Sequence, residues 1–327
     1  MLYPNGSFDL TLTLLCGQCF RWKRSPSPEW FEGVAGGAFW RIRQDGPKIL
    51  WECSSSWVRG SQPSDWISEY LNLGQDLAEF EAGFQDHPIL AEPIRLLRGL
   101  RLMKQEPWEC AVSYLFAQSL SVKVIRKALE NFCNRFGEEV AGAPGHRAFP
   151  EPGLISRLNP ADLRPFANNN RARAERIVKL ARSQEAGVVS LPFLRTIDCD
   201  EARQALMALE GIGPKIADCI LLFSLDHGSA FPLDRWVLRA MKEHFPSVRF
   251  LGRVGINPTP SQYPQMVKRA RAAFGPWCGL ASEYLFLYFR LLEDQGLQSE
   301  LERYPAILPS PHRKKEKNVS FKVPKKL

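Results

Sequence analysis

Residues 209–218, Leu-Glu-Gly-Ile-Gly-Pro-Lys-Ile-Ala-Asp, constrain the fold of this chain more than any other segment. We expect one helix to end near Leu209, and Pro214 suits the first position of the next helix because its missing N–H is not needed there. Gly211 and Gly213 permit backbone angles that other residues resist. The exposed N–H groups of such a hairpin, with the positive end of the second helix, form a phosphate site. The full string favours a DNA-binding hairpin over an ordinary helix–helix turn.

Lys215 and Asp234 are the candidate chemical groups. Lys215 lies in the first turn of the second predicted helix, and Asp234 directly precedes the helical run from Val237 to Phe245. Asp234 is therefore near an N-cap position, which favours the ionised carboxylate. An amine nucleophile with a carboxylate is the equipment needed to attack an electron-poor sugar carbon and form a Schiff base. Taken alone, a surface lysine and a capping aspartate would be the simpler interpretation.

The two halves of the chain differ in their pattern. Residues 1–60 are β-rich: residues 40–43 alternate apolar and basic, residues 44–47 form a turn, and residues 48–53 predict a second strand. From residue 105 to about 300 the apolar spacing is mostly helical. We therefore predict an α+β fold, with a β-rich domain over residues 1–104, a helical domain over 105–304, and a disordered basic tail over 305–327.

Charge and hydropathy limit the function classes. The chain has 327 residues, a net charge of +8, and 45% hydrophobic residues, the balance of a folded domain pair. The segment from Arg313 onward supplies +6 of that charge, so we expect it to add salt-sensitive, sequence-independent affinity for DNA. Apolar runs stay far below the ~18–20 residues of a membrane span. The first residues lack a signal-peptide pattern, which favours an intracellular, DNA-associated protein.

The eight cysteines are mostly scattered singly in apolar surroundings, the usual pattern of reduced thiols. Cys16 and Cys19 form one C-x-x-C pair, but no second pair follows at zinc-finger spacing. A strand or turn with two small residues is therefore a better interpretation than a metal or redox site.

Together these segments resemble the 8-oxoguanine DNA glycosylase/AP lyase family of the helix-hairpin-helix glycosylase superfamily. Residues 17–22, Gly-Gln-Cys-Phe-Arg-Trp, are similar to its N-terminal motif, and residues 215–219 to its catalytic helix. Residues 231–234 end a loop like the one that carries its aspartate, and Gly275-Pro276 leading to Phe286 resembles its pocket helix. The resemblance covers about residues 5–300. It implies a β-rich lesion-recognition domain followed by an all-α helix-hairpin-helix catalytic domain.

The resemblance also implies roles for individual residues. Lys215 would attack C1′ of a nucleotide extruded from the duplex, and Asp234 would stabilise the oxocarbenium charge. The resulting Schiff base permits β-elimination of the 3′ phosphate. The Gly17 carbonyl would accept a hydrogen bond from the protonated N7 of 8-oxoguanine and repel guanine, while Cys219 and Phe286 would enclose the flipped base. The implied partner is double-stranded DNA that contains a damaged base.

The sequence departs from the family at several positions. The family's three asparagines, which fill the vacated stack and read the opposite cytosine, align with residues 119–121; Gln118 precedes them, and Leu120 could still act as a wedge. The glutamine that reads the lesion's Watson–Crick edge aligns with Ser282. A histidine–aspartate pair aligns with Trp236 and Phe289, a joint replacement that suggests repacking. These changes affect lesion identity and opposite-base preference rather than lyase chemistry.

Arg171 and Arg173 resemble arginines at a helix start that lean toward the opposite DNA strand, although a solvated basic face explains them equally well. Some relatives hold an iron–sulfur cluster with four cysteines after the catalytic domain. Here only Cys278 follows Asp234, so we expect no cluster, no metal and no cofactor. A monomer is the default expectation.

Two alternatives differ in class from a bifunctional glycosylase. A monofunctional alkylated-base glycosylase of the same superfamily would need only the aspartate and water, which leaves Lys215 unexplained. A non-catalytic DNA-binding hairpin protein would not explain why Lys215, Asp234 and the Gly17 motif occur together.

Overall fold

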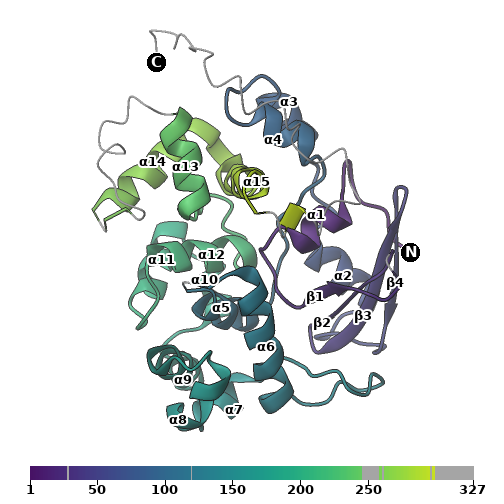
Figure 1. Ribbon diagram of the computed structural model, residues 1–327, viewed down its shortest axis with the longest axis vertical. Coiled ribbons are helices and arrows are strands. Elements are labelled where there is room, and N and C mark those ends of the chain that lie inside the picture. Colours follow the sequence, from purple (N-terminus) through teal and green to yellow (C-terminus); the bar gives the residue numbers. More distant parts are fainter. Residues whose placement is uncertain (28, 119, 245–257, 260, 295–296, 299–327) are drawn as a thin grey trace.

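The computed structural model describes residues 1–27, 29–118, 120–244, 258–259, 261–294 and 297–298 (Figure 1). Ser119 and the predicted basic tail lie outside the described residues. Within them, no helix has the length and apolarity needed to cross a membrane.

A four-stranded antiparallel sheet forms the N-terminal part, in the order β1 (Trp22–Arg24), β2 (Phe31–Ala35), β3 (Ala38–Asp45) and β4 (Lys48–Cys53). The predicted hairpin is confirmed, since Asp45 pairs with Lys48 across the β3–β4 turn. Trp40 on β3 is fully buried and stacks on Trp66 of α2 (Pro63–Tyr70), with ring centroids 5.5 Å apart. The alternation of apolar and basic residues on β3 thus places its apolar face under a helix.

Helices form the rest of the described chain. Their bounds are α1 (Leu10–Leu15), α3 (Ala78–Phe84), α4 (Ala91–Leu96), α5 (Pro107–Phe116), α6 (Val122–Phe136), α7 (Pro152–Ser156), α8 (Pro160–Leu163), the 3₁₀ turn η1 (Arg164–Phe166), α9 (Arg171–Glu185), α10 (Leu191–Leu194), α11 (Cys199–Met207), α12 (Pro214–Ser224), α13 (Arg235–His244), α14 (Gln262–Phe274), the 3₁₀ turn η3 (Gly275–Trp277) and α15 (Cys278–Leu291). The α+β class, with an N-terminal antiparallel sheet followed by a mostly helical part, is confirmed.

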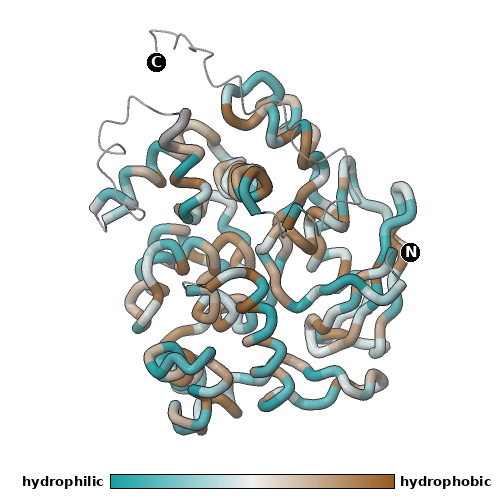
Figure 2. Tube along the Cα trace, viewed as in Figure 1, coloured by the Kyte–Doolittle hydropathy of each residue, from teal (hydrophilic) through white to brown (hydrophobic). Residues whose placement is uncertain are grey.

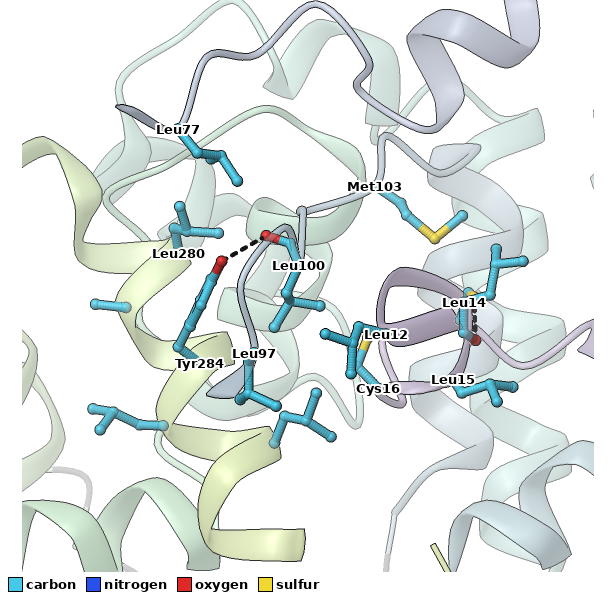
Figure 3. Packing of buried hydrophobic residues seen from close by; sticks show 14 of the residues in the cluster. Leu12, Leu14, Leu15, Cys16, Leu77, Leu97, Leu100, Met103, Leu280 and Tyr284 are labelled. Atoms are coloured by element: carbon cyan, nitrogen blue, oxygen red, sulfur yellow. Dashed lines mark hydrogen bonds between the residues drawn. The ribbon is translucent and has the colours of Figure 1, made fainter. Parts of the chain in front are cut away.

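The hydrophobic packing divides the chain differently from the predicted boundary at residue 104. One core joins residues 10–103 to α13, α14 and α15, whereas the other is built mainly from residues 110–230. Figure 3 shows α15 against the N-terminal part, where Tyr284 Oη donates to the Leu100 carbonyl at 3.2 Å. The C-terminal helices thus return to the N-terminal part, because their apolar faces complete its core.

The two cores meet in the middle of the molecule. Figure 1 shows the sheet on one side and α11, α13 and α14 on the opposite side, with α1, α5, α12 and α15 between them. Figure 2 shows hydrophobic segments of α1 and α15 in this inner region. The junction brings together α12 from the second core and α15 from the first, so residues from distant parts of the sequence can share one cavity.

Candidate active site

The predicted glycine hairpin connects α11 to α12, as the sequence indicates. Gly211 has a φ of +88°, and a Cβ there would lie 2.2 Å from Cδ of Arg176, so both conformation and space require glycine. Gly213 differs from the expectation, because its φ of −87° is accessible to other residues. It precedes Pro214 as the N-cap of α12, and a Cβ there would meet nothing within 4 Å. The open side of Gly213 therefore leaves room for a close ligand.

Gln118 supports this hairpin from the end of α5. Its Nε2 donates to the Gly211 carbonyl at 2.8 Å, and its Oε1 accepts from Arg176 Nη1 at 3.0 Å. Sequence reasoning missed Arg176, which follows Arg173 by three residues and so shares its side of α9. The Gln118 amide thereby fixes the hairpin relative to α5 and α9.

The position of Arg173 in the structure disagrees with the expectation that this residue contacts DNA. Its side chain is buried and donates to the carbonyls of Leu115, Ala167 and Gln118. A guanidinium satisfied by three carbonyls inside the protein would lose those bonds if it turned outward. Arg171 is exposed and pairs with Glu175 at 2.8 Å, so it remains available as a predicted DNA contact.

Asp234 caps α13, as predicted. Its Oδ1 accepts from the backbone N–H groups of Trp236 at 2.8 Å and Val237 at 2.9 Å. Burial raises the pKa of Asp234, whereas the nearby Lys215 charge and the two capping hydrogen bonds lower it, and the net direction is upward. The effect of burial on the pKa of Asp234 is therefore larger than the combined effects of the capping hydrogen bonds and the Lys215 charge.

A buried polar network holds the loop that carries Asp234 against α12. Asp218 on α12 accepts from Tyr263 Oη at 2.7 Å and from Arg203 Nε at 2.6 Å. Tyr263 Oη also lies 3.3 Å from the Phe231 carbonyl oxygen and accepts from the backbone N–H of Leu233 at the same distance. Because Asp218 lies one helical turn after Lys215, the network positions both ends of the Lys215–Asp234 pair.

One cavity of roughly 1220 Å³ collects almost all of the predicted site residues. Of those residues, Arg171 and Arg173 are absent from its lining. The predicted residues that line it are Gly17, Gln118, Leu120, Gly211, Gly213, Lys215, Cys219, Asp234, Ser282 and Phe286. They come from the α1 end, the α5–α6 turn, the hairpin, α12, the Asp234 loop and α15, so only the folded chain brings them together.

The turn at Gly17 presents its backbone to this cavity. Its φ is +114°, and a Cβ there would lie 3.0 Å from Arg290 Nη1 and 3.5 Å from Phe286 Cε1. The flanking carbonyls are used, that of Cys16 by Arg290 Nη1 and that of Gln18 by Gln105 Nε2. Among the described residues none donates to the Gly17 carbonyl, which leaves it available to a ligand.

Gln18 fixes that turn from within. Its side chain is buried, and its amide donates to the carbonyls of Thr13 and Arg101 while its Oε1 accepts from the backbone N–H of Met103. These bonds tie the Gly17 turn to the segment that leads from the N-terminal part into α5. The buried hydrogen bonds of Gln18 therefore hold the backbone at Gly17 in one position.

Cys219 and Phe286 face the cavity from α12 and α15. Burial raises the pKa of the Cys219 thiol to about 12, so it presents a neutral, polarizable surface rather than a thiolate. The Phe286 ring lies under the Arg290 guanidinium, 6.0 Å from Cζ to the ring centroid. An apolar thiol and an aromatic ring suit a flat, planar ligand.

Comparisons with known proteins agree with this geometry. Residues 1–111 match the family model described as 8-oxoguanine DNA glycosylase, N-terminal domain. An N-glycosylase/DNA lyase OGG1 of Arabidopsis thaliana is 29% identical over 85% of this chain and 76% of that protein. A probable N-glycosylase/DNA lyase of Methanothermobacter thermautotrophicus is 27% identical over 89% of this chain and 96% of that protein.

A solved structure shows the same fold. The 8-oxoguanine glycosylase/lyase of Clostridium acetobutylicum, bound to double-stranded DNA with cytosine opposite 8-oxoguanine, superposes with a TM-score of 0.74. It is 25% identical, over 86% of this chain and 92% of that one.

The chain thus carries an N-terminal domain of the 8-oxoguanine DNA glycosylase type, and it is similar over most of its length to N-glycosylase/DNA lyases. The structure shows where the residues lie at two places at which the sequence departs from the family's pattern. Trp236 and Phe289, which stand where a polar pair was expected, both join the core around α13 and α15, as joint repacking requires. Ser282 lines the cavity, but its Oγ donates to the Gly279 carbonyl at 2.7 Å within its own helix.

Sequence reasoning missed a carboxylate in the cavity wall, that of Glu283. Glu283 is 4% exposed, and burial raises its pKa to about 7. Asp234 raises the pKa further by like-charge repulsion, whereas Cys16 and Arg290 lower it. A single acidic residue in the otherwise uncharged, mostly apolar stretch of residues 280–289 is the signal that could have revealed it.

The raised pKa makes Glu283 a source of pH-dependent stability. Since the folded chain binds this proton more tightly than the unfolded chain, the unfolding free energy should fall as pH rises from 4.5 to about 7. We expect Glu283→Gln to stabilise the protein at pH 8 by on the order of 3 kcal/mol, and by under about 1 kcal/mol at pH 5. Urea unfolding at both pH values measures this, and equal gains at the two would contradict it.

Proposed function

We propose that this chain removes 8-oxoguanine-type oxidised purines from duplex DNA and then cleaves the strand as an AP lyase, in base excision repair. The observation that carries the proposal is the shared cavity, in which Lys215 and Asp234 face the Gly17 turn, Cys219 and Phe286. One copy of the chain contains all of these groups, so we expect it to act as a monomer.

The chemistry follows from the Lys215–Asp234 pair. As the N-glycosidic bond breaks, positive charge develops at C1′, and the Asp234 carboxylate would stabilise it. The base leaves with the bonding electron pair, the Lys215 amine bonds to C1′, and the proton that the amine loses is taken up by the departing base anion. Ring opening gives a Schiff base, which acidifies the C2′ proton. Loss of that proton and cleavage of the C3′–O bond release the 3′ phosphate.

Recognition of the lesion uses the Gly17 carbonyl. In guanine N7 is an acceptor, whereas in 8-oxoguanine it carries a proton. A carbonyl held in place by the hydrogen bonds of Cys16 and Gln18 would accept from the lesion and repel guanine. Because an unpaired buried polar group costs ~1–3 kcal/mol, this one atom discriminates substantially.

DNA would lie across the mouth of this cavity, since base excision requires the nucleotide to be extruded into it. The hairpin at Gly211 and Gly213 offers backbone N–H groups to a phosphate. Leu120 and Gln118 line the same cavity, and we expect Leu120 to act as the wedge that fills the vacated stack. Arg171 adds an exposed positive charge on the neighbouring helix α9.

Borohydride trapping tests this proposal. Duplexes that contain 8-oxoguanine opposite cytosine, or an alkylated base, are incubated with the enzyme, and covalent adducts and released bases are measured. We expect an adduct and base release on the 8-oxoguanine duplex. Base release with no adduct would point to a monofunctional enzyme instead, and DNA binding with neither signal would point to a binding protein.

A further inference from the structure

Glu283 is a buried polar group that the proposed reaction does not use. Its Oε1 is inaccessible to solvent and has no hydrogen-bond partner in the described part of the chain. Buried polar atoms in folded proteins are nearly always paired, so an exception in a ligand cavity calls for an explanation. The neighbouring Arg290 does not supply one, because its Nε donates to Asp294 and its Nη1 to the Cys16 carbonyl.

The position of Glu283 links it to the base-binding part of the cavity. It follows Ser282 on α15 and lies one turn before Phe286, and all three residues line the cavity. Its carboxyl interacts with the Cys16 thiol, next to the Gly17 turn, and repels the Asp234 carboxylate. The Glu283 carboxyl is therefore close enough to interact both with the residue before Gly17, whose carbonyl would read N7, and with Asp234, which would act at the sugar.

The chemistry of the carboxylate selects the ligand it can pair with. An ionised carboxylate only accepts hydrogen bonds, through two oxygens side by side. The Watson–Crick edge of a guanine-type base offers two adjacent donors, N1–H and the 2-amino group. That of adenine offers its 6-amino donor beside the N1 acceptor. Ser282 stands where the family has a base-reading glutamine, but its hydroxyl proton is donated to Gly279.

We propose that the Glu283 carboxylate accepts hydrogen bonds from N1–H and the 2-amino group of the flipped base, and so selects guanine-type lesions. This inference rests on the proposed function and adds a specificity-determining residue to it. The carboxylate would do through two acceptors what a glutamine does with one acceptor and one donor, which explains how the chain can carry serine at position 282.

Charges around Glu283 define the pH dependence of this contact. The thiols of Cys16, Cys19 and Cys219 and the Tyr114 hydroxyl have raised pKa values because of burial, so they are neutral near pH 7. The charged groups that face Glu283 are Asp234 and Arg290. With a pKa of about 7, Glu283 is partly protonated at neutral pH, and kcat/KM for 8-oxoguanine should fall as it gains its proton.

The test removes one donor from the substrate and the acceptor from the enzyme. Single-turnover excision is compared on duplexes that contain 8-oxoguanine or 8-oxohypoxanthine, which lacks only the 2-amino group. We expect the wild type to prefer 8-oxoguanine by about 10- to 100-fold, as for one charge-assisted hydrogen bond. Glu283→Ala should reduce this preference to about 3-fold or less, and Glu283→Gln should reduce it and remove the acidic limb near pH 7.

Two controls separate this inference from folding and from the proposed function. Glu293→Gln makes the same substitution at an exposed residue just beyond α15 and should keep the wild-type preference. Borohydride trapping on a preformed abasic site requires no base recognition, so the Glu283 variants should retain it. An unchanged preference in both Glu283 variants would overturn the inference while leaving the proposed function intact. The inference would also be overturned if the Glu283 variants lost as much activity on the abasic duplex as on the 8-oxoguanine duplex. A wild type that forms no adduct would refute the proposed function itself.

Discussion

Replacing Lys215 with glutamine is expected to abolish the adduct that borohydride traps on an 8-oxoguanine duplex and to lower base excision by about 10³-fold or more. The variant keeps a polar side chain of similar reach in the first turn of α12, where glutamine is a good helix former. It loses the amine that bonds to C1′. Denaturing electrophoresis after borohydride treatment, with single-turnover product release, measures both effects.

Lys179→Gln is the matched control for this variant. Lys179 is an exposed lysine of α9 whose Nζ pairs with Glu210 beside the hairpin, outside the cavity lining. Its replacement removes one positive charge near the same surface, so excision should stay within about 3-fold of the wild type. An adduct that survives Lys215→Gln would assign the nucleophile to another group and contradict the mechanism.

Replacing Asp234 with asparagine is expected to slow base excision by about 10²- to 10³-fold without unfolding the protein. Asparagine caps helices as well as aspartate does, so the bonds from Trp236 and Val237 are retained. The substitution removes the negative charge that stabilises C1′ as the base departs. Cleavage of a preformed abasic site should be affected less, because the aldehyde reacts with Lys215 without an oxocarbenium intermediate.

The corresponding control is Asp198→Asn at a second helix start. Asp198 caps α11 by accepting from the backbone N–H groups of Asp200 and Glu201, away from the cavity. This variant should leave both activities near the wild-type level. Thermal unfolding of the two variants checks that the caps are intact. If Asp234→Asn lost the same fraction of its activity on the 8-oxoguanine duplex as on the abasic duplex, this would contradict a role for the Asp234 charge in base departure.

The junction between the two cores explains why these predictions involve distant parts of the chain. Lys215 belongs to a helix of the second core, whereas Asp234 starts a helix of the first. The Asp218–Tyr263 hydrogen bond, 2.7 Å long, joins the two cores. A cavity remains between α12 and α15 at this junction because neither core fills that space.

Local patterns in the sequence were enough to predict several features of the structure. The β3–β4 hairpin, the glycine hairpin before α12 and the cap at Asp234 depend on residues within a few positions of one another. The physical causes are equally local: turn geometry, the fixed φ of proline and a side chain that accepts from nearby N–H groups. The motif at Gly17 likewise predicted a residue whose backbone faces the cavity.

The sequence by itself thus determined the order of sheet and helices, the hairpin and the identity of the candidate nucleophile and carboxylate. Only the tertiary structure decided that Arg173 turns inward, that α13–α15 complete the N-terminal core, and that Glu283 is buried with an unpaired oxygen. The reason is that burial, and the pKa shifts and hydrogen bonds it imposes, depend on contacts between segments far apart in the chain. No local pattern of residues specifies which of those contacts form.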